Sequence, residues 1–139
     1  MTRRVLLWGP PVAWMAAIFW VSSLSDVPGV PGRVSPAVAH FGEYAVLALL
    51  LVRAFAGGHS AGVTWRTLAA AGLVSTAYGI SDEWHQSFVP GRAPELADVA
   101  MDAAGAAAAA GAARAWSIIN RFSRSRRELD GVHEPSSRA

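Results

Sequence analysis

The sequence predicts an all-α, polytopic membrane protein, built as a four-transmembrane-helix bundle with N-in/C-in topology. Of the 139 residues, 53% are hydrophobic and only 16% are charged, whereas soluble proteins usually carry about 25% charged residues. Four long apolar stretches are separated by short segments that are charged or rich in glycine and proline. When these stretches are threaded through a membrane in order, the arginines fall mainly on one side. A soluble helical bundle, the competing interpretation, gives no reason for that pattern.

The four apolar stretches are unequal as membrane spans. A spanning helix needs roughly 17–25 mainly apolar residues, and only the first and the fourth stretches reach that length. The fourth also contains Asp102 and Arg114, and the second is uncharged only between Glu43 and Arg53. In chain order the stretches are Val5–Val21, Phe41–Ala56, Thr67–Ile80 and Val99–Ile119.

The two outer stretches each allow a second interpretation. Arg3 and Arg4 precede the first stretch as they would in a signal peptide, but Val21–Ser23 is a poor cleavage site. Three further apolar stretches follow, so we expect a retained span. The fourth stretch could be a flexible low-complexity linker, but glycine is sparse there and alanine is the best helix former, so we expect a helix. Its small residues favour close helix packing, either within the chain or in a homo-oligomer. We expect residues 1–120 to form the membrane domain and residues 121–139 a basic, disordered cytoplasmic tail.

The arginines set the predicted orientation. Basic residues in short loops are enriched on the cytoplasmic side, and all twelve basic residues of this chain are arginine. With the N-terminus inside, Arg33 and Arg92 fall outside, and Arg138 lies far along the tail. The other nine fall on the cytoplasmic side: Arg3, Arg4, Arg53, Arg66, Arg114, Arg121, Arg124, Arg126 and Arg127. We therefore expect a multi-pass plasma membrane protein with both termini cytoplasmic.

Composition excludes several chemistries. The chain has no cysteine, which excludes a thiol nucleophile, a disulfide and a thiolate metal site. It also has no lysine, which excludes a Schiff-base lysine, a Ser-Lys dyad and a complete phosphate-binding P-loop. The fragment DEWH, residues 82–85, matches the spelling of a helicase motif, but no P-loop accompanies it. We expect no nucleic acid partner.

The acidic residues gather on the side opposite to the arginines. Ionisable residues at membrane depth are costly and usually line a cavity or a pathway. His40 and His85 fall on that side too, so we predict an extracytoplasmic polar pocket. Seven of the ten acids lie there: Asp26, Glu43, Asp82, Glu83, Glu95, Asp98 and Asp102.

Acid and histidine side chains recur at helical spacing around this pocket. His40 and Glu43 are three residues apart, as are Asp82 and His85, so each pair shares a helix face. These four residues offer two nitrogen and two oxygen ligands, which predicts a site for a divalent metal ion. Glu83 is the candidate general base and, with His85, makes the candidate catalytic pair.

The remaining pocket residues are predicted to bind the substrate or ligand. Three serines end the first stretch at the depth of the pocket, and two tyrosines each offer an apolar ring with a polar tip. The predicted binding residues are Ser22, Ser23, Ser25, Tyr44, Tyr78, Gln86, Arg92, Asp98 and Asp102.

Three functions remain open from these residues. The first is a protein that binds or remodels an anionic lipid without catalysis, with Arg92 and Arg33 gripping a phosphate. The second is a metal-dependent membrane hydrolase or transferase, in which the ion polarises a phosphoryl or acyl oxygen. The third is a small proton-coupled carrier, which alone would depend on the proton gradient.

Three segments of the chain match a known family in order: FWVSSLSDVP (Phe19–Pro28), HFGEYAVLALLLVRA (His40–Ala54) and YGISDEWHQSFVPGRAPELADVAMDAAGA (Tyr78–Ala106). By these segments the chain resembles the VanZ-like family, small bacterial membrane proteins whose founding member is linked to teicoplanin resistance. The resemblance covers most of the chain from Phe19 to about Gly111. It implies a polytopic membrane protein that acts on or near lipid-linked cell-envelope material, and a link to glycopeptide resistance. The family often has asparagine where this chain has Asp102.

Overall fold

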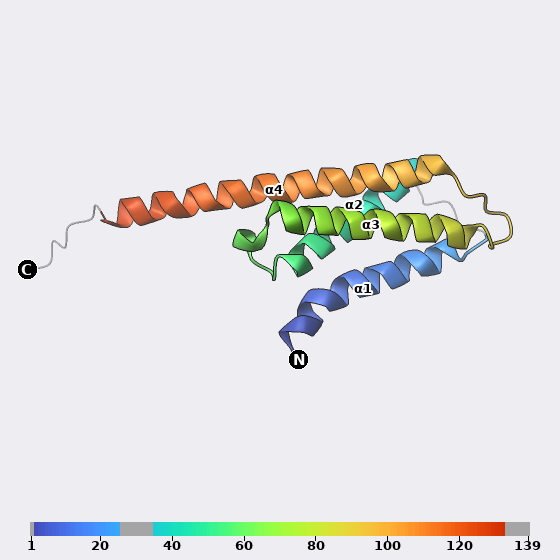
Figure 1. Ribbon diagram of the computed structural model, residues 1–139, viewed down its shortest axis with the longest axis horizontal. Coiled ribbons are helices and arrows are strands. Elements are labelled where there is room, and N and C mark those ends of the chain that lie inside the picture. Colours follow the sequence, from blue (N-terminus) through green and yellow to red (C-terminus); the bar gives the residue numbers. More distant parts are fainter. Residues whose placement is uncertain (1, 26–34, 133–139) are drawn as a thin grey trace, which may run out of the picture.

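Four long helices form the protein in a computed structural model, which describes residues 2–25 and 35–132. The helices are α1 (Arg3–Ser22), α2 (Pro36–Phe55), α3 (Trp65–Gln86) and α4 (Leu96–Val132), and a short 3-10 helix, η1 (Ser60–Gly62), connects α2 to α3. The described residues contain no β-strand, which confirms the predicted all-α class. Figure 1 shows the helices lying side by side, with α4 projecting beyond the others toward its C-terminus.

Three of the four helices are long and apolar enough to cross a membrane. They are α1, α2 and the Leu96–Ser123 part of α4. The third helix has sufficient length, but it carries Arg66 near its start and Asp82 and Glu83 near its end, and these charges lower its hydropathy. The structure therefore confirms apolar, membrane-compatible helices.

Two adjacent prolines interrupt the hydrogen bonding of α1. Pro10 and Pro11 lie inside the helix, and proline has no backbone N–H to donate to the carbonyl four residues earlier. The carbonyl of Leu6 thereby loses its usual donor. Arg53 of α2 supplies a replacement, because its guanidinium Nη1 donates to the Leu6 oxygen at 3.0 Å.

Side-chain caps determine where α2 and α3 begin. The Ser35 hydroxyl accepts from the backbone N–H of Val38, and Pro36 occupies the first turn, where its missing N–H has no cost. Thr64 and Thr67 cap the start of α3 reciprocally. These polar caps explain why both helices begin before the apolar stretches that hydropathy identifies.

Small residues allow α4 to pack closely against α2. Ala48 of α2 is buried with Ala106 and Ala109 of α4. A Cβ atom added at Gly105 would collide with the backbone carbonyl of Phe41, so only glycine permits this approach. The alanine- and glycine-rich face therefore packs within the chain, and a homo-oligomer through α4 stays a prediction.

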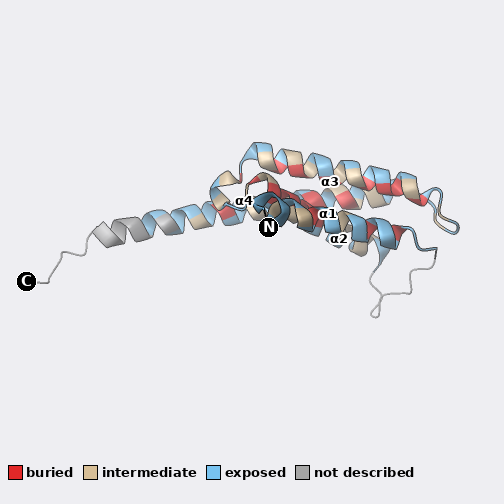
Figure 2. Ribbon diagram, turned by 90° about the horizontal axis from the view of Figure 1, so that it is seen from below, coloured by how far each residue is buried: buried red, intermediate tan, exposed pale blue. Residues whose placement is uncertain are grey.

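The largest buried cluster lies between α1, α2 and α3, around Tyr44, Leu47, Leu51 and Leu68. Figure 2 shows buried residues on the faces that the helices turn toward one another. Large apolar side chains also cover the outside: Trp20, Leu73 and Trp116 are each at least 66% exposed, as expected of surfaces in contact with lipid.

The fourth helix extends further than hydropathy predicts. We expected a disordered tail from Arg121, whereas α4 continues to Val132. Arginine and glutamate are good helix formers, so the polar segment can continue the helix without apolar packing. The predicted tail residues 133–139 lie outside the described part of the chain.

Candidate functional site

Most of the buried polar side chains gather at one end of the bundle, where α1 and α3 end and α2 and α4 begin. This end lies on the right in Figure 1. It contains every acidic residue whose side chain the structure describes, and both histidines predicted for the site. We call it the acid end. Its buried polar residues are Ser22, Asp82, Glu83, Gln86 and Asp102.

His40 of α2 lies between two carboxylates of α4. Its Nδ1 atom lies 3.0 Å from Oδ1 of Asp102 and donates to it, while its Nε2 atom lies 3.6 Å from Oδ2 of Asp98. The two aspartates are four residues apart, so the same face of α4 presents both. Asp102 is fully buried and Asp98 is half-buried. The imidazole is therefore fixed at one nitrogen by the deeper carboxylate and directs the other toward the shallower one.

Glu83 of α3 completes this arrangement from a third helix. One carboxylate oxygen, Oε2, accepts a hydrogen bond of 2.8 Å from the backbone N–H of Glu95. The other, Oε1, is buried and has no hydrogen-bond partner among the described residues. Glu83 is only 5% exposed, and a buried carboxylate oxygen without a hydrogen-bond partner is energetically costly.

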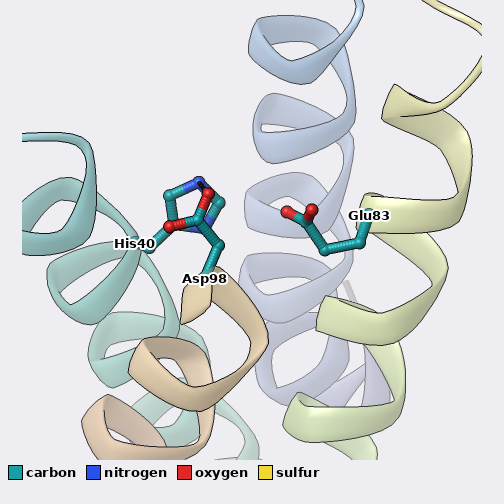
Figure 3. A group of neighbouring side chains, drawn as sticks. All are labelled: His40, Glu83 and Asp98. Carbon is teal, nitrogen blue, oxygen red and sulfur yellow. Dashed lines mark ion pairs between the residues drawn. The ribbon is translucent and has the colours of Figure 1, made fainter. Parts of the chain in front are cut away.

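Three ligand-type atoms, one each from His40, Glu83 and Asp98, lie within 4.8 Å of one another. Figure 3 shows the three side chains, from α2, α3 and α4, directed into one space. Nitrogen and oxygen ligands sharing one ion at about 2.0–2.2 Å lie roughly 3–3.5 Å apart. His40 Nε2 and Asp98 Oδ2, at 3.6 Å, are already close to that separation. We call them the ligand triad.

Asp82, next to Glu83 in sequence, belongs to a different group facing α1. Its Oδ2 atom accepts from the Ser22 hydroxyl at 2.7 Å and from the Gln86 amide at 3.0 Å. Its Oδ1 atom is buried with no partner among the described residues. The end of α1 is thus held against α3 by a bond to a buried carboxylate.

His85 also faces α1. Its ring stacks on Phe19, with 4.3 Å between the ring centroids, and its Nε2 atom lies 3.0 Å from the Ser23 hydroxyl. That hydroxyl donates to the Phe19 carbonyl at 2.7 Å, so it accepts its bond from the His85 nitrogen.

Two tyrosines lie deeper in the bundle. Tyr44 is fully buried, its ring lies parallel to that of His40 at a centroid distance of 6.5 Å, and its hydroxyl has no partner among the described residues. Tyr78 donates to the Met15 carbonyl at 2.6 Å. Gly79 lies against Oδ2 of Asp102, another buried oxygen without a described partner, and a Cβ atom there would displace it.

The other predicted site residues lie at the edge. Arg92 is half-buried, and its Nε atom donates to the Leu24 carbonyl at 3.3 Å. Ser25 is exposed, and Glu43 is half-buried on α2, outside the ligand triad. Asp26 and Arg33 lie outside the described residues.

The structure divides the predicted metal set between two groups. His40 belongs to the ligand triad, while Asp82 and His85 contact α1. The other two members of the triad had different predicted roles. Glu83 was predicted as a general base and Asp98 as a substrate-binding residue. The four-residue spacing of Asp98 and Asp102 is the sequence signal that could have identified α4 as a source of metal ligands.

The chain was also compared with known proteins. No curated protein and no solved structure matches it significantly. A model of the VanZ/LLP1 family matches residues 11–119, which is more than half of the chain and includes every residue of the acid end described above. The chain therefore belongs to the VanZ/LLP1 family.

Proposed function

We propose that this protein binds a divalent metal ion at the ligand triad and uses it to hold or transform the phosphate group of a membrane lipid or a lipid-linked envelope component. The observation that carries the proposal is the convergence of His40, Glu83 and Asp98 from three helices onto one small space. A metal ion held by these three residues would have free coordination positions for the lipid phosphate.

The environment of Glu83 supports a cation rather than an anion as the resident group. Its Oε1 atom is buried without a described partner, while the backbone of Glu95 fixes Oε2. A cation compensates such an oxygen directly. An anionic headgroup alone would meet Glu83, Asp98 and Asp102 at close range and be repelled.

Asp102 has the position of a group that orients a metal ligand. Metal-binding histidines usually donate their second ring N–H to a carboxylate, which fixes the ring and increases its basicity as a ligand. The bond from His40 Nδ1 to Asp102 leaves Nε2 for the ion. Asp102 is therefore a positioning residue, whereas Asp98 is a ligand.

Bound at the triad, an ion would polarise a phosphoryl oxygen of the lipid and lower the pKa of a bound water. The chain's own residues would orient the headgroup, with Arg92 at the edge offering a planar guanidinium. This site fits a metal-dependent hydrolase or transferase and also a metal-dependent binding protein. Turnover of a lipid phosphate ester distinguishes the two, and the link to teicoplanin resistance stays a prediction.

The test is the metal content of protein purified in detergent without chelator. We expect close to one Zn²⁺ or Mn²⁺ per chain in the wild type, and loss of the ion in Glu83→Gln and Asp98→Asn. Glu95→Gln is the matched control, because this exposed acid contributes only its backbone N–H. Equal metal content in the wild type and both triad variants would refute the proposal.

We also propose that all four helices span the membrane, with the acid end outside and both termini in the cytoplasm. The support is the distribution of arginines and the length of α3, 22 residues. Reporter fusions at Gly58 and Pro90, on either side of α3, should report opposite sides of the membrane. The same side for both would show that α3 does not cross.

A further inference from the structure

We propose that a groove at the opposite end of the bundle is a binding site for an anionic phospholipid, with one acyl chain along the groove and the phosphate at Arg53. This end contains the start of α1, the α2–α3 connection and the middle of α4, and we call it the arginine end. The proposal is independent of the metal site.

The groove runs between α2 and α4 below the connection between α2 and α3, and has a volume of about 560 Å³. Its floor is apolar, with Leu49 and Val52 from α2 and Ala112 and Ala113 from α4. Trp116 lies at its edge and is 66% exposed. Tryptophan is enriched at the level of lipid headgroups, so the groove has the character of a site between hydrocarbon and headgroups.

Arginine side chains at this end have no ion-pair partner among the described side chains. Arg53 is part of its lining, and the bond to Leu6 uses only one of its five N–H donors. Both ion pairs found among the described side chains involve His40 at the acid end. Basic pockets between membrane helices bind anionic lipid headgroups. The arginines at this end with described side chains are Arg3, Arg4, Arg53, Arg66, Arg114 and Arg121.

Arginines also hold the wall of the groove in place. Arg3 donates to the Gly57 carbonyl at 2.8 Å, and its guanidinium lies 2.7 Å from Nε2 of His59, which must accept because arginine only donates. Arg114 and Arg121 of α4 donate to the carbonyls of Val63 and Ala61. The connection is thus attached to both α1 and α4, which preforms the site.

Charge selects the ligand among membrane lipids. The apolar floor can bind an acyl chain of any phospholipid, so it does not discriminate between headgroups. The guanidinium of Arg53, which has no ion-pair partner among the described side chains, adds a preference for a phospholipid with net negative charge over a zwitterionic one of the same chain length.

The experiment measures binding of phosphatidylglycerol and phosphatidylcholine with identical chains to the detergent-purified full-length protein, by native mass spectrometry. We expect wild type to retain phosphatidylglycerol preferentially. Arg53→Gln should weaken the binding of phosphatidylglycerol about five-fold, which is the contribution expected of one arginine near an anionic headgroup. Ala112→Trp should abolish it, because the indole fills the groove from an exposed position on α4.

Matched controls separate the groove from general charge and bulk. Arg66→Gln removes an exposed arginine of the same end, and Ala107→Trp adds an indole to α4 outside the groove; both should bind as wild type does. Ala112→Leu repeats the test with a smaller side chain if the tryptophan variant does not fold. Equal binding of the two lipids by wild type, or unchanged binding by Ala112→Leu, would overturn the proposal. Glu83→Gln should bind phosphatidylglycerol normally whether or not the metal proposal holds.

Discussion

The two ends of this bundle handle charge in opposite ways. At the acid end, Asp82, Glu83 and Asp102 are buried between helices, and each keeps one oxygen without a described partner. At the arginine end, the exposed guanidinium groups of Arg3, Arg53 and Arg121 donate to backbone carbonyls of neighbouring segments. Buried charges without partners are costly, whereas exposed arginine bonds cost little and gain little. This contrast is the basis of our two proposals, a metal ion at the acid end and an anionic lipid at the arginine end.

The largest effect we expect concerns the close helix approach beside the acid end. Gly105→Ala should destabilise the protein by about 3 kcal/mol, because the added methyl group meets the unyielding Phe41 carbonyl. Gly111→Ala, six residues nearer the arginine end, adds its methyl group to open space. It should stabilise the helix by roughly 0.5–1 kcal/mol. Unfolding by SDS in mixed micelles measures both, and effects of the same sign would contradict the packing described.

The next effect concerns the fixed imidazole. Asp102→Asn should weaken Zn²⁺ or Mn²⁺ binding roughly 10–100-fold, as loss of an orienting carboxylate does, while Asp98 and Glu83 remain. His85→Ala should leave the affinity unchanged, because His85 contacts α1 rather than the triad. Titration of metal into chelator-treated protein distinguishes these outcomes. If His85→Ala lost as much metal affinity as Asp102→Asn, the result would favour the metal ligands predicted from sequence, which include His85.

A smaller effect tests how α1 is attached. Ser22→Ala should destabilise the protein by about 1–1.5 kcal/mol, because it removes one hydrogen bond to a buried carboxylate oxygen that keeps its bond from Gln86. Ser23→Ala, at an exposed position, should cost less. The same SDS titration measures the free energy of unfolding of both variants. Equal losses would show that a hydrogen bond to the buried Asp82 carboxylate stabilises the protein no more than an exposed one.

The smallest effect should come from the arginine end. Arg121→Ala removes an exposed bond to the Ala61 carbonyl, and water replaces it, so we expect a loss of about 0.5 kcal/mol. A loss larger than that of Ser22→Ala would overturn the contrast between the two ends.

Hydropathy and charge predicted much of this fold. The all-α class, the number of long helices and the place of the acidic cluster follow from apolar length and from the alternation of charge along the chain. Helix boundaries were predicted less well. The second helix begins at Pro36 rather than Phe41 because Ser35 caps a polar first turn, which adds nothing to hydropathy.

The membership of each side-chain group could not be predicted from the sequence, because it depends on how each helix is rotated about its own axis. Asp82 and Glu83 are neighbours, yet successive residues point about 100° apart around a helix. One therefore faces Ser22 of α1 and the other faces His40 and Asp98. Spacing within a single helix fixes which residues share a face, but it does not tell which neighbouring helix that face meets.

The bond between Arg53 and the Leu6 carbonyl has a consequence for biogenesis. In the topology that we propose, the Leu6 carbonyl, deprived of its donor by Pro10, and the long side chain of Arg53 would both pass through the edge of the hydrocarbon layer before they meet, where an unpaired polar group is unfavourable. Each compensates the other only after both segments have left the translocation machinery. In that topology, α2 would therefore complete the insertion of α1, and a chain stopped before Arg53 would present an unfinished first helix to the membrane.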